Sequence, residues 1–222
     1  IEHTKKVIYL DDGEIAVADR KGLRISTLKN LRVNKKIQEI KWDLEEIEKG
    51  GFSHFMLKEI FEQPETVRNA IRGRVIAKEA KIQLGGVADW LDYFAKAKRA
   101  VFMACGTSWH AALIGEYLFE DLADISTEVE YASEFRYKRV LINKESIYFV
   151  ISQSGETADT LESLHKVKKA EARIFGIVNV VGSTVARETD AGIYLHAGPE
   201  IGVASTKAFT SQVTVLTQLA LL

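Results

Sequence analysis

Residues 146–170 read SIYFVISQSGETADTLESLHKVKKA, and this stretch decides the fold class. It begins with a continuous apolar run, which is typical of a strand covered on both faces. It ends in a segment that reads as a helix over about 157–170. Hydroxyl residues and a glycine crowd the junction at residues 152–157. The pattern predicts one strand, loop and helix of a parallel sheet.

The same alternation runs from Arg99 onward. Strands are expected at 100–104, 127–131, 146–151, 173–179 and 191–196. Helices are expected at about 109–122, 132–137 and 157–170, with a brief turn near 183–188 and a last helix at the end of the chain. This alternation, with strands apolar on both faces, predicts an α/β fold with an open parallel five-stranded sheet flanked by helices.

Three helices are expected ahead of the sheet. The first covers 52–61, where apolar residues recur at helical spacing. Pro64 is well placed to open a second helix that runs through Val75, because proline favours the first helical turn. A third helix is expected over 87–97, with Trp90 and Phe94 on its apolar face.

The first 40 residues read differently. Short apolar runs alternate with Asp-Gly and Lys-Gly turns, which predicts a three-stranded antiparallel meander left over from a larger sheet. Residues 41–51 are charged and end in two glycines, as a linker does. We therefore expect a partial domain at 1–40, a linker at 41–51 and a main domain at 52–222. Because the sequence starts without Met and stops inside a helical pattern, we expect a piece of a longer protein.

Composition narrows the class of partner. The 222 residues are 46% hydrophobic and 27% charged with a net charge of −1, and no apolar run is long enough to cross a bilayer. The sequence has no cluster of Lys and Arg of the kind that binds nucleic acid. We therefore expect a small molecule or another protein as the partner, and neither nucleic acid nor a membrane. The lone cysteine, Cys105, excludes an internal disulfide and fits a small buried hydrophobe better than a catalytic thiol. A reducing cytoplasm is the expected location.

Two loops carry the candidate chemistry. Residues 105–108 read CGTS and residues 152–157 read SQSGET, and each lies between an expected strand and an expected helix. Backbone N–H groups at a helix start have no intrahelical partner and carry the positive end of the dipole, so hydroxyl residues there complete a cage for a phosphate dianion. Small residues of 198–208 fit the same pocket. We expect one phosphorylated ligand beyond the carboxyl ends of the strands.

Plainer interpretations exist for each of these residues. Ser and Thr are the usual N-caps, so Ser205 or Thr206 fits a capping role, as does one hydroxyl of residues 152–157. Glu156 and Glu200 flank the expected pocket as general bases, or as capping and salt-bridge residues, since a phosphate repels a carboxylate beside it. The five histidines show no spacing typical of metal ligands.

Several long motifs resemble one family of enzymes. They are CGTS at 105–108, ASEFRY at 132–137, SQSGETADT at 152–160, EIGVASTKAFTSQ at 200–212 and KEIFEQP at 58–64. Together they resemble the isomerising glutamine–fructose-6-phosphate aminotransferases, from about Phe52 to the end of the chain. The first 40 residues are similar to the closing strands of that family's glutaminase half.

The resemblance implies an enzyme that takes ammonia from glutamine in one domain and joins it to fructose 6-phosphate in two sugar-isomerase (SIS) domains, giving glucosamine 6-phosphate. It implies no metal or organic cofactor, and a homodimer formed through the isomerase half. The residues that match its substrate-binding positions are Thr107, Ser108, Ser152, Gln153, Ser154, Thr157, Val203 and Ser205. No catalytic residue falls in this chain, and Lys207 fits a dipole or packing role better than that of the family's Schiff-base lysine. We therefore expect binding without turnover.

Two other functions fit an α/β chain of this kind. One is a non-catalytic SIS module that senses a sugar phosphate, but the N-terminal strands and residues 58–64 argue against it, since a regulator should carry a basic DNA-binding unit. The other is a nucleotide-binding domain, yet neither G-x-G-x-x-G nor G-x-x-x-x-G-K-[ST] follows any expected strand.

Overall fold

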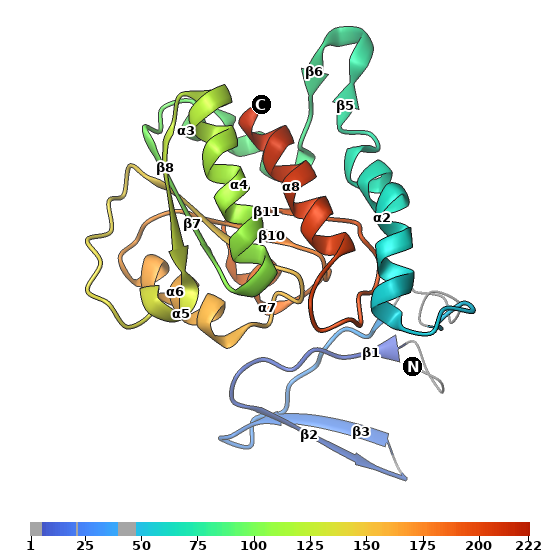
Figure 1. Cartoon of the computed structure of the whole chain (residues 1–222). Helices are drawn as coiled ribbons and strands as arrows, with labels where there is room; N and C mark the ends of the chain where they lie inside the picture. The colour runs from blue at the N-terminus through green and yellow to red at the C-terminus, as the bar shows by residue number, and fades with distance from the viewer. Residues whose placement is uncertain (1–5, 21, 40–47) are drawn as a thin grey trace. The chain divides into compact units, whose positions relative to one another are not determined.

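The computed structural model describes residues 6–20, 22–39 and 48–222 (Figure 1). The chain divides into two compact units, one ending at Glu48 and one beginning at Lys49. The expected linker at 41–51 lies mostly outside the described residues.

The described residues of the first unit form four short strands in two antiparallel pairs. β2 (Glu14–Asp19) pairs with β3 (Gly22–Thr27), and β1 (Lys6–Val7) pairs with β4 (Gln38–Glu39). The predicted short antiparallel strands are confirmed, with β2 and β3 as a hairpin, but they do not form one three-stranded meander, because β1 pairs with β4 instead of with β2. Lys35 forms ion pairs with both Asp11 and Glu14, which brings the returning chain back to the segment that follows β1.

The second unit is built on one parallel sheet of five strands. The strands are β7 (Arg99–Ala104), β8 (Ser126–Tyr131), β9 (Ile147–Ser152), β10 (Ile174–Val178) and β11 (Ala191–Tyr194). Their order across the sheet is β11-β10-β9-β7-β8, with every pairing parallel. The predicted fold class is confirmed, and each predicted strand agrees with the structure to within two residues at either end.

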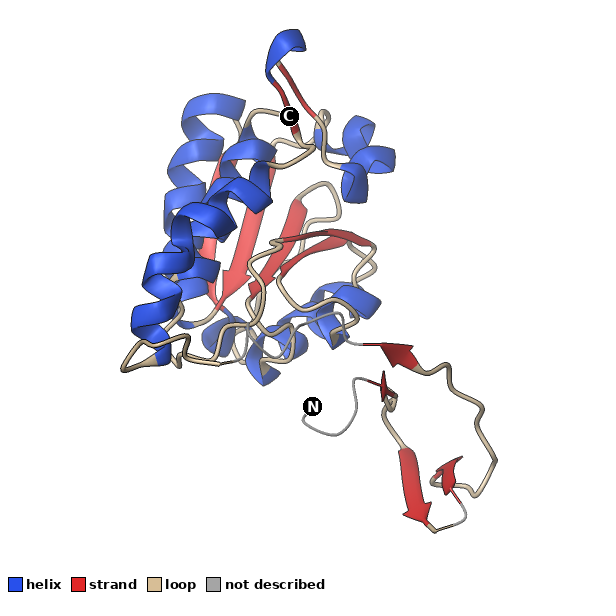
Figure 2. Ribbon diagram, turned by 90° about the vertical axis from the view of Figure 1, so that its right-hand side faces the viewer, coloured by secondary structure: helices blue, strands red, loops and turns tan. Residues whose placement is uncertain are grey.

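Helices cover both faces of this sheet. α2 (Phe55–Ile71), α4 (Gly106–Ala123) and α8 (Lys207–Ala220) lie on one face, and α4 and α8 run side by side (Figures 1 and 2). α5 (Ala132–Phe135), α6 (Ala158–Lys169) and α7 (Thr184–Glu188) belong to the other face. Alternate residues of each strand therefore enter two separate cores. In β7, Phe102 faces the core of α4 and α8, whereas Val101 and Met103 face the core of α5 and α6.

α2 is one helix, although Pro64 was expected to open a second one. Proline removes the N–H that would bind the carbonyl four residues back, which is Ile60 O. The Gln63 Nε2 donates a hydrogen bond to that carbonyl oxygen at 3.1 Å instead. The carbonyl group therefore has a partner, and the helix continues through Pro64. A hairpin of β5 (Val75–Ile76) and β6 (Lys81–Ile82) follows, with a 3₁₀ turn, η1 (Ala77–Glu79), between them.

The helix predicted over 87–97 is also wrong in form. The segment is a 3₁₀ helix, η2 (Gly85–Trp90), followed by a single turn, α3 (Leu91–Phe94). The rings of Trp90, Tyr93 and Phe94 nevertheless pack on Phe175 in the core, with centroids 4.8–6.1 Å apart. The apolar spacing of the segment alone did not distinguish a 3₁₀ helix from an α-helix. In the part of the chain that the structure describes, no helix is long and apolar enough to span a bilayer.

Candidate functional site

A pocket of about 410 Å³ opens at the carboxyl ends of β7 and β9. These strands are neighbours, but the chain leaves β7 toward β8 and leaves β9 toward β10, on opposite sides. Such a reversal of strand order is where open α/β sheets bind ligands. The pocket is lined by Cys105, Gly106, Thr107, Ser108, Ile151, Ser152, Gln153, Ser154, Thr157, Val203, Ala204 and Ser205. All eight residues predicted from the sequence therefore lie around one cavity.

Two helices begin at this pocket without a side-chain cap. Cys105 is the N-cap of α4 and Thr157 is the N-cap of α6, and neither side chain hydrogen-bonds to its helix. The first N–H groups of both helices thus keep their capacity to bind an anion, and both dipoles place their positive ends here. Gly106, with φ of +57°, adopts the left-handed backbone that glycine favours. Helix capping therefore does not account for the Thr157 hydroxyl.

The loop after β9 is organised by its own hydroxyls. Ser152 is buried, and its Oγ accepts a hydrogen bond from the Gly155 N–H at 3.0 Å and lies 3.2 Å from Thr157 Oγ1. The Ser154 Oγ accepts the Glu156 N–H at 3.1 Å. Each hydroxyl keeps further hydrogen-bonding capacity. Gly155 has a φ of +68°, and a Cβ there would overlap Ser183, so this position requires glycine.

The loop after β7 is held from behind by α8. Gln212 is fully buried, and its Nε2 donates a hydrogen bond to Ser108 Oγ at 2.9 Å. Ser108 acts as the acceptor in that bond, so its own proton is left for an acceptor in the pocket. Sequence reasoning assigned no role to Gln212. The sequence offered one signal for it, because Gln212 is a polar residue on the same face of the predicted last helix as the apolar Ala208 and Val215.

No charged side chain lines the pocket in the described part of the chain. The two flanking carboxylates are used elsewhere. Glu156 Oε1 accepts the Thr184 N–H at 2.7 Å, at the start of α7, and Glu200 Oε1 accepts the Thr206 N–H at 2.7 Å, at the start of α8. The capping interpretation of both glutamates is therefore correct, and it leaves the pocket without the negative charge that would repel a phosphate.

Lys207 is buried with an ion-pair partner. Its Nζ lies 2.6 Å from Glu62 Oε2, and only 4% of its side chain is exposed. Because the residue opens α8, a cation here is on the unfavourable end of the helix dipole, and Glu62 offsets that cost. Packing and the ion pair with Glu62, not the helix dipole, therefore account for the buried position of Lys207.

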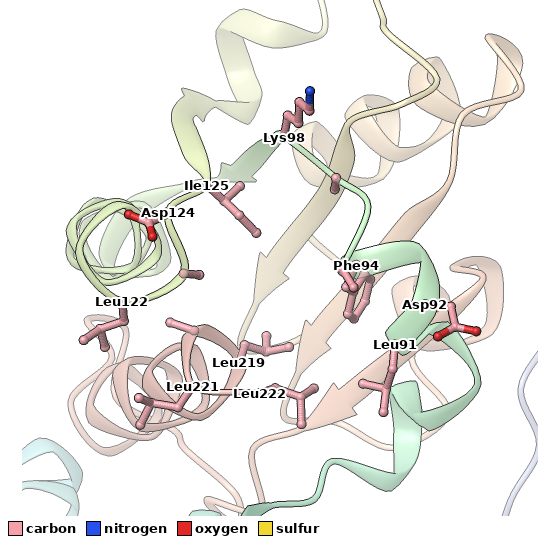
Figure 3. Close-up of a pocket in the computed structure, with 14 residues that line it drawn as sticks. Leu91, Asp92, Phe94, Lys98, Leu122, Asp124, Ile125, Leu219, Leu221 and Leu222 are labelled. Atoms are coloured by element: carbon pink, nitrogen blue, oxygen red, sulfur yellow. The ribbon is translucent and has the colours of Figure 1, made fainter.

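A larger cavity, of about 700 Å³, lies at the amino ends of β7 and β8 (Figure 3). Most of its lining is apolar, including Phe94, Leu122, Ile125 and Leu219, with single charges such as Asp124. It lacks the hydroxyl loops and helix starts of the smaller pocket, so it does not suit an anion. Across residues 6–20, 22–39 and 48–222, no three His, Cys, Asp or Glu side chains come together as a metal site.

Comparison with known proteins agrees with this geometry. The family model described as the SIS domain matches residues 93–222, which is more than half of the chain. The chain belongs to the SIS-domain family. The matched region contains both hydroxyl loops and the whole parallel sheet.

Curated proteins similar to this chain are named as aminotransferases. It is 57% identical over 221 residues to the isomerising glutamine–fructose-6-phosphate aminotransferase of Chlorobaculum tepidum, and 51% identical over 222 residues to that of Bacteroides thetaiotaomicron. The chain spans 36% of the length of each. Among solved structures, the C-terminal domain of glucosamine-fructose-6-phosphate aminotransferase from Francisella tularensis matches with a TM-score of 0.71 and 44% identity, covering 78% of this chain and 48% of that one. The family resemblance seen in the motifs is confirmed.

Proposed function

We propose that this chain is the fructose-6-phosphate-binding part of an isomerising glutamine–fructose-6-phosphate aminotransferase, an enzyme that makes glucosamine 6-phosphate. The observation that carries the proposal is the pocket at the carboxyl ends of β7 and β9. It combines hydroxyls, an amide and two uncapped helix starts, and none of the described carboxylates lines it. Such a set of neutral donors suits a phosphate dianion, because every hydrogen bond to it is charge-assisted.

Each part of the pocket has a distinct role in this proposal. The hydroxyls of Ser152, Ser154 and Thr157 and the amide of Gln153 hold the phosphate oxygens. Thr107 and Ser108 contact the same group from the start of α4. Val203 and Ser205 face the sugar from the loop that precedes α8.

Anchoring is the chain's contribution to catalysis. A phosphate fixed at one end of the pocket directs the reactive carbons of the sugar outward, where catalytic groups can meet them. Holding reactants in this way removes much of the entropic barrier of a reaction, provided that those groups are present. We propose that they lie in segments outside these 222 residues, so this chain binds the sugar phosphate without turning it over.

The proposal extends to the whole protein. The strands of the first unit belong to a glutaminase domain that supplies ammonia, and the isomerase halves pair as a homodimer. The reaction needs no metal or organic cofactor. The lone cysteine suits the reducing cytoplasm as its location.

Calorimetric titration of the 222-residue chain with fructose 6-phosphate, NAD and ATP tests this function. We expect saturable binding of the sugar phosphate alone. Saturation by a nucleotide alone would overturn the proposal in favour of a nucleotide-binding domain.

A double variant, Ser154→Ala with Thr157→Ala, locates the site. It should weaken fructose 6-phosphate binding about tenfold while changing the free energy of unfolding by no more than about 1 kcal/mol, because neither hydroxyl is fully buried. The control is Ser53→Ala with Ser126→Ala, which removes two exposed hydroxyls outside the pocket. Equal affinity in both double variants would contradict the assignment.

A further inference from the structure

One wall of the pocket is a segment without regular secondary structure. Val203, Ala204 and Ser205 line the cavity, between the end of the sheet and the start of α8. Val203 is fully exposed and Ala204 is exposed as well. Side-chain burial therefore contributes little to holding this wall, and something else must fix its backbone.

Glu59 makes the bonds that fix it. This residue lies on α2 and is only 2% exposed. Its Oε1 accepts hydrogen bonds from the Ile201 N–H at 2.6 Å and from the Gly202 N–H at 3.1 Å, and its Oε2 lies 3.2 Å from the same Gly202 nitrogen. Hydrogen bonds from N–H groups to a buried carboxylate are charge-assisted and shorter than average, so they fix the loop strongly.

Gly202 fits this contact by having no side chain. A Cβ at this position would lie 2.5 Å from Glu59 Oε2, closer than real Cβ atoms approach another heavy atom. A side chain at residue 202 would therefore force either the loop backbone or the Glu59 carboxylate to shift.

A second tie to α2 lies just beyond the loop. Glu62, one helical turn after Glu59, pairs with the buried Lys207 at the start of α8, with Nζ 2.6 Å from Oε2. Lys58 lies 3.5 Å from the other oxygen of Glu62. Both ends of the segment from Ile201 to Lys207 are thus anchored on one face of α2, while Val203, Ala204 and Ser205 between them line the pocket.

We infer that Glu59 is a positioning residue that sets the affinity of the pocket for a sugar phosphate by fixing the backbone of Ile201 and Gly202. The inference deepens the proposed function and rests on it. Glu59 does not line the cavity, so it does not contact the ligand itself. Its charge is directed at two N–H groups, and it acts on the ligand only through the placement of Val203 and Ser205.

Two variants perturb this contact from opposite sides. Glu59→Gln keeps the size of the side chain but removes its charge and turns one acceptor into a donor. Gly202→Ala leaves every charge in place and forces the loop and the Glu59 carboxylate apart. Each should weaken fructose 6-phosphate binding by about tenfold, the change in affinity expected when a displaced loop loses one hydrogen bond to the ligand. Calorimetry well below the melting temperature of each variant gives the affinity of folded protein.

Glu65→Gln is the matched control, because it removes the same charge from an exposed position on the same helix. Its affinity should stay within about twofold of the parent chain. Amide hydrogen exchange provides the second readout, in which the Ile201 and Gly202 N–H groups exchange faster in Glu59→Gln while the buried amides of β9 do not change. Gly202→Ala should raise the exchange of the Ile201 N–H in the same way.

Faster exchange with weaker binding supports the inference. Faster exchange with unchanged affinity overturns it, since Glu59 would then be a purely structural tie, and unchanged exchange overturns it as well. A parent chain that bound no sugar phosphate would instead defeat the proposed function, and the exchange rates would still show whether Glu59 orders the loop.

Discussion

The Gln212 side chain donates a hydrogen bond of 2.9 Å to Ser108 across 104 positions of sequence. The pair joins α8 to α4 directly behind the pocket, and Gln212 is fully buried. The amide oxygen of Gln212 has no hydrogen-bond partner among the described residues. The only bond that this side chain makes there is therefore the one that also orients a pocket hydroxyl.

Ser108→Ala should cost more stability than Gln212→Leu. Removing the hydroxyl leaves a buried amide with no partner, a loss of about 1–3 kcal/mol, whereas leucine replaces the amide with an apolar group of similar size. The Ser108→Ala/Gln212→Leu double variant should show a coupling energy of about 1 kcal/mol in urea unfolding. Strictly additive effects would mean that the two side chains do not interact in solution.

Gly155→Ala should destabilise the chain more than Gly106→Ala. Both glycines have positive φ, which costs a side chain about 1–2 kcal/mol, but only Gly155 would place a Cβ onto Ser183. No atom lies within 4 Å of a Cβ at Gly106. Chemical denaturation of the two variants measures the difference, and Ser183→Gly should recover part of the Gly155→Ala loss. If both alanines cost the same, the overlap is relieved at no cost.

Glu116→Gln should stabilise the chain at neutral pH. Burial, followed by the charges of Glu120 and Glu128, raises the pKa of Glu116 above its usual value of 4.5. The folded state then binds this proton more tightly than the unfolded state, so the ionised carboxylate lowers stability at pH 7, and the penalty disappears as the pH falls toward 4.5. Thermal melts should show a higher melting temperature for Glu116→Gln at pH 7 and a gain that shrinks in acid.

The exposed Glu65 supplies the control for this experiment. Glu65→Gln changes the net charge by the same amount without relieving any burial. A gain for Glu116→Gln that did not depend on pH, or one matched by Glu65→Gln, would rule out the proposed cause.

Phe149→Ala should cost about 3–5 kcal/mol, the usual range for removing a buried aromatic ring. Phe149 is 1% exposed and its ring contacts Phe94, Phe102, Phe119 and Phe175. Phe61→Ala gives the comparison, because that ring is 66% exposed and should cost less than about 1 kcal/mol. Similar free energies of unfolding for the two variants would show that β9 is not the centre of the core.

The sequence predicted the sheet well because each strand is a local signal. The run Ile147–Ser152 is buried at every position, so its apolar pattern could be recognised without any other part of the chain. Elements whose form depends on distant partners were predicted poorly. Residues 85–94 form a 3₁₀ helix and one α turn whose three rings pack on the distant Phe175, and β1 pairs with β4 instead of with β2.

The candidate site divides in the same way. Its hydroxyls and glycines were visible in the sequence, because a strand, a loop rich in Ser and Thr and a helix start follow one another locally. The residues that support it were not visible. Gln212 and Glu59 act on partners 104 and 142 positions away, and no local pattern marks such a bond.

The sequence alone thus determined the alternation of strands and helices and the identity of the two oxygen-rich loops, since backbone preference and side-chain periodicity act over a few residues. Only the tertiary structure decided that β7 lies beside β9, that Gln212 and Glu59 support the pocket from behind, and that Glu156 and Glu200 serve helix starts instead of the cavity. Those outcomes depend on strand order and on hydrogen bonds between distant segments, which form only when the two cores pack against the sheet.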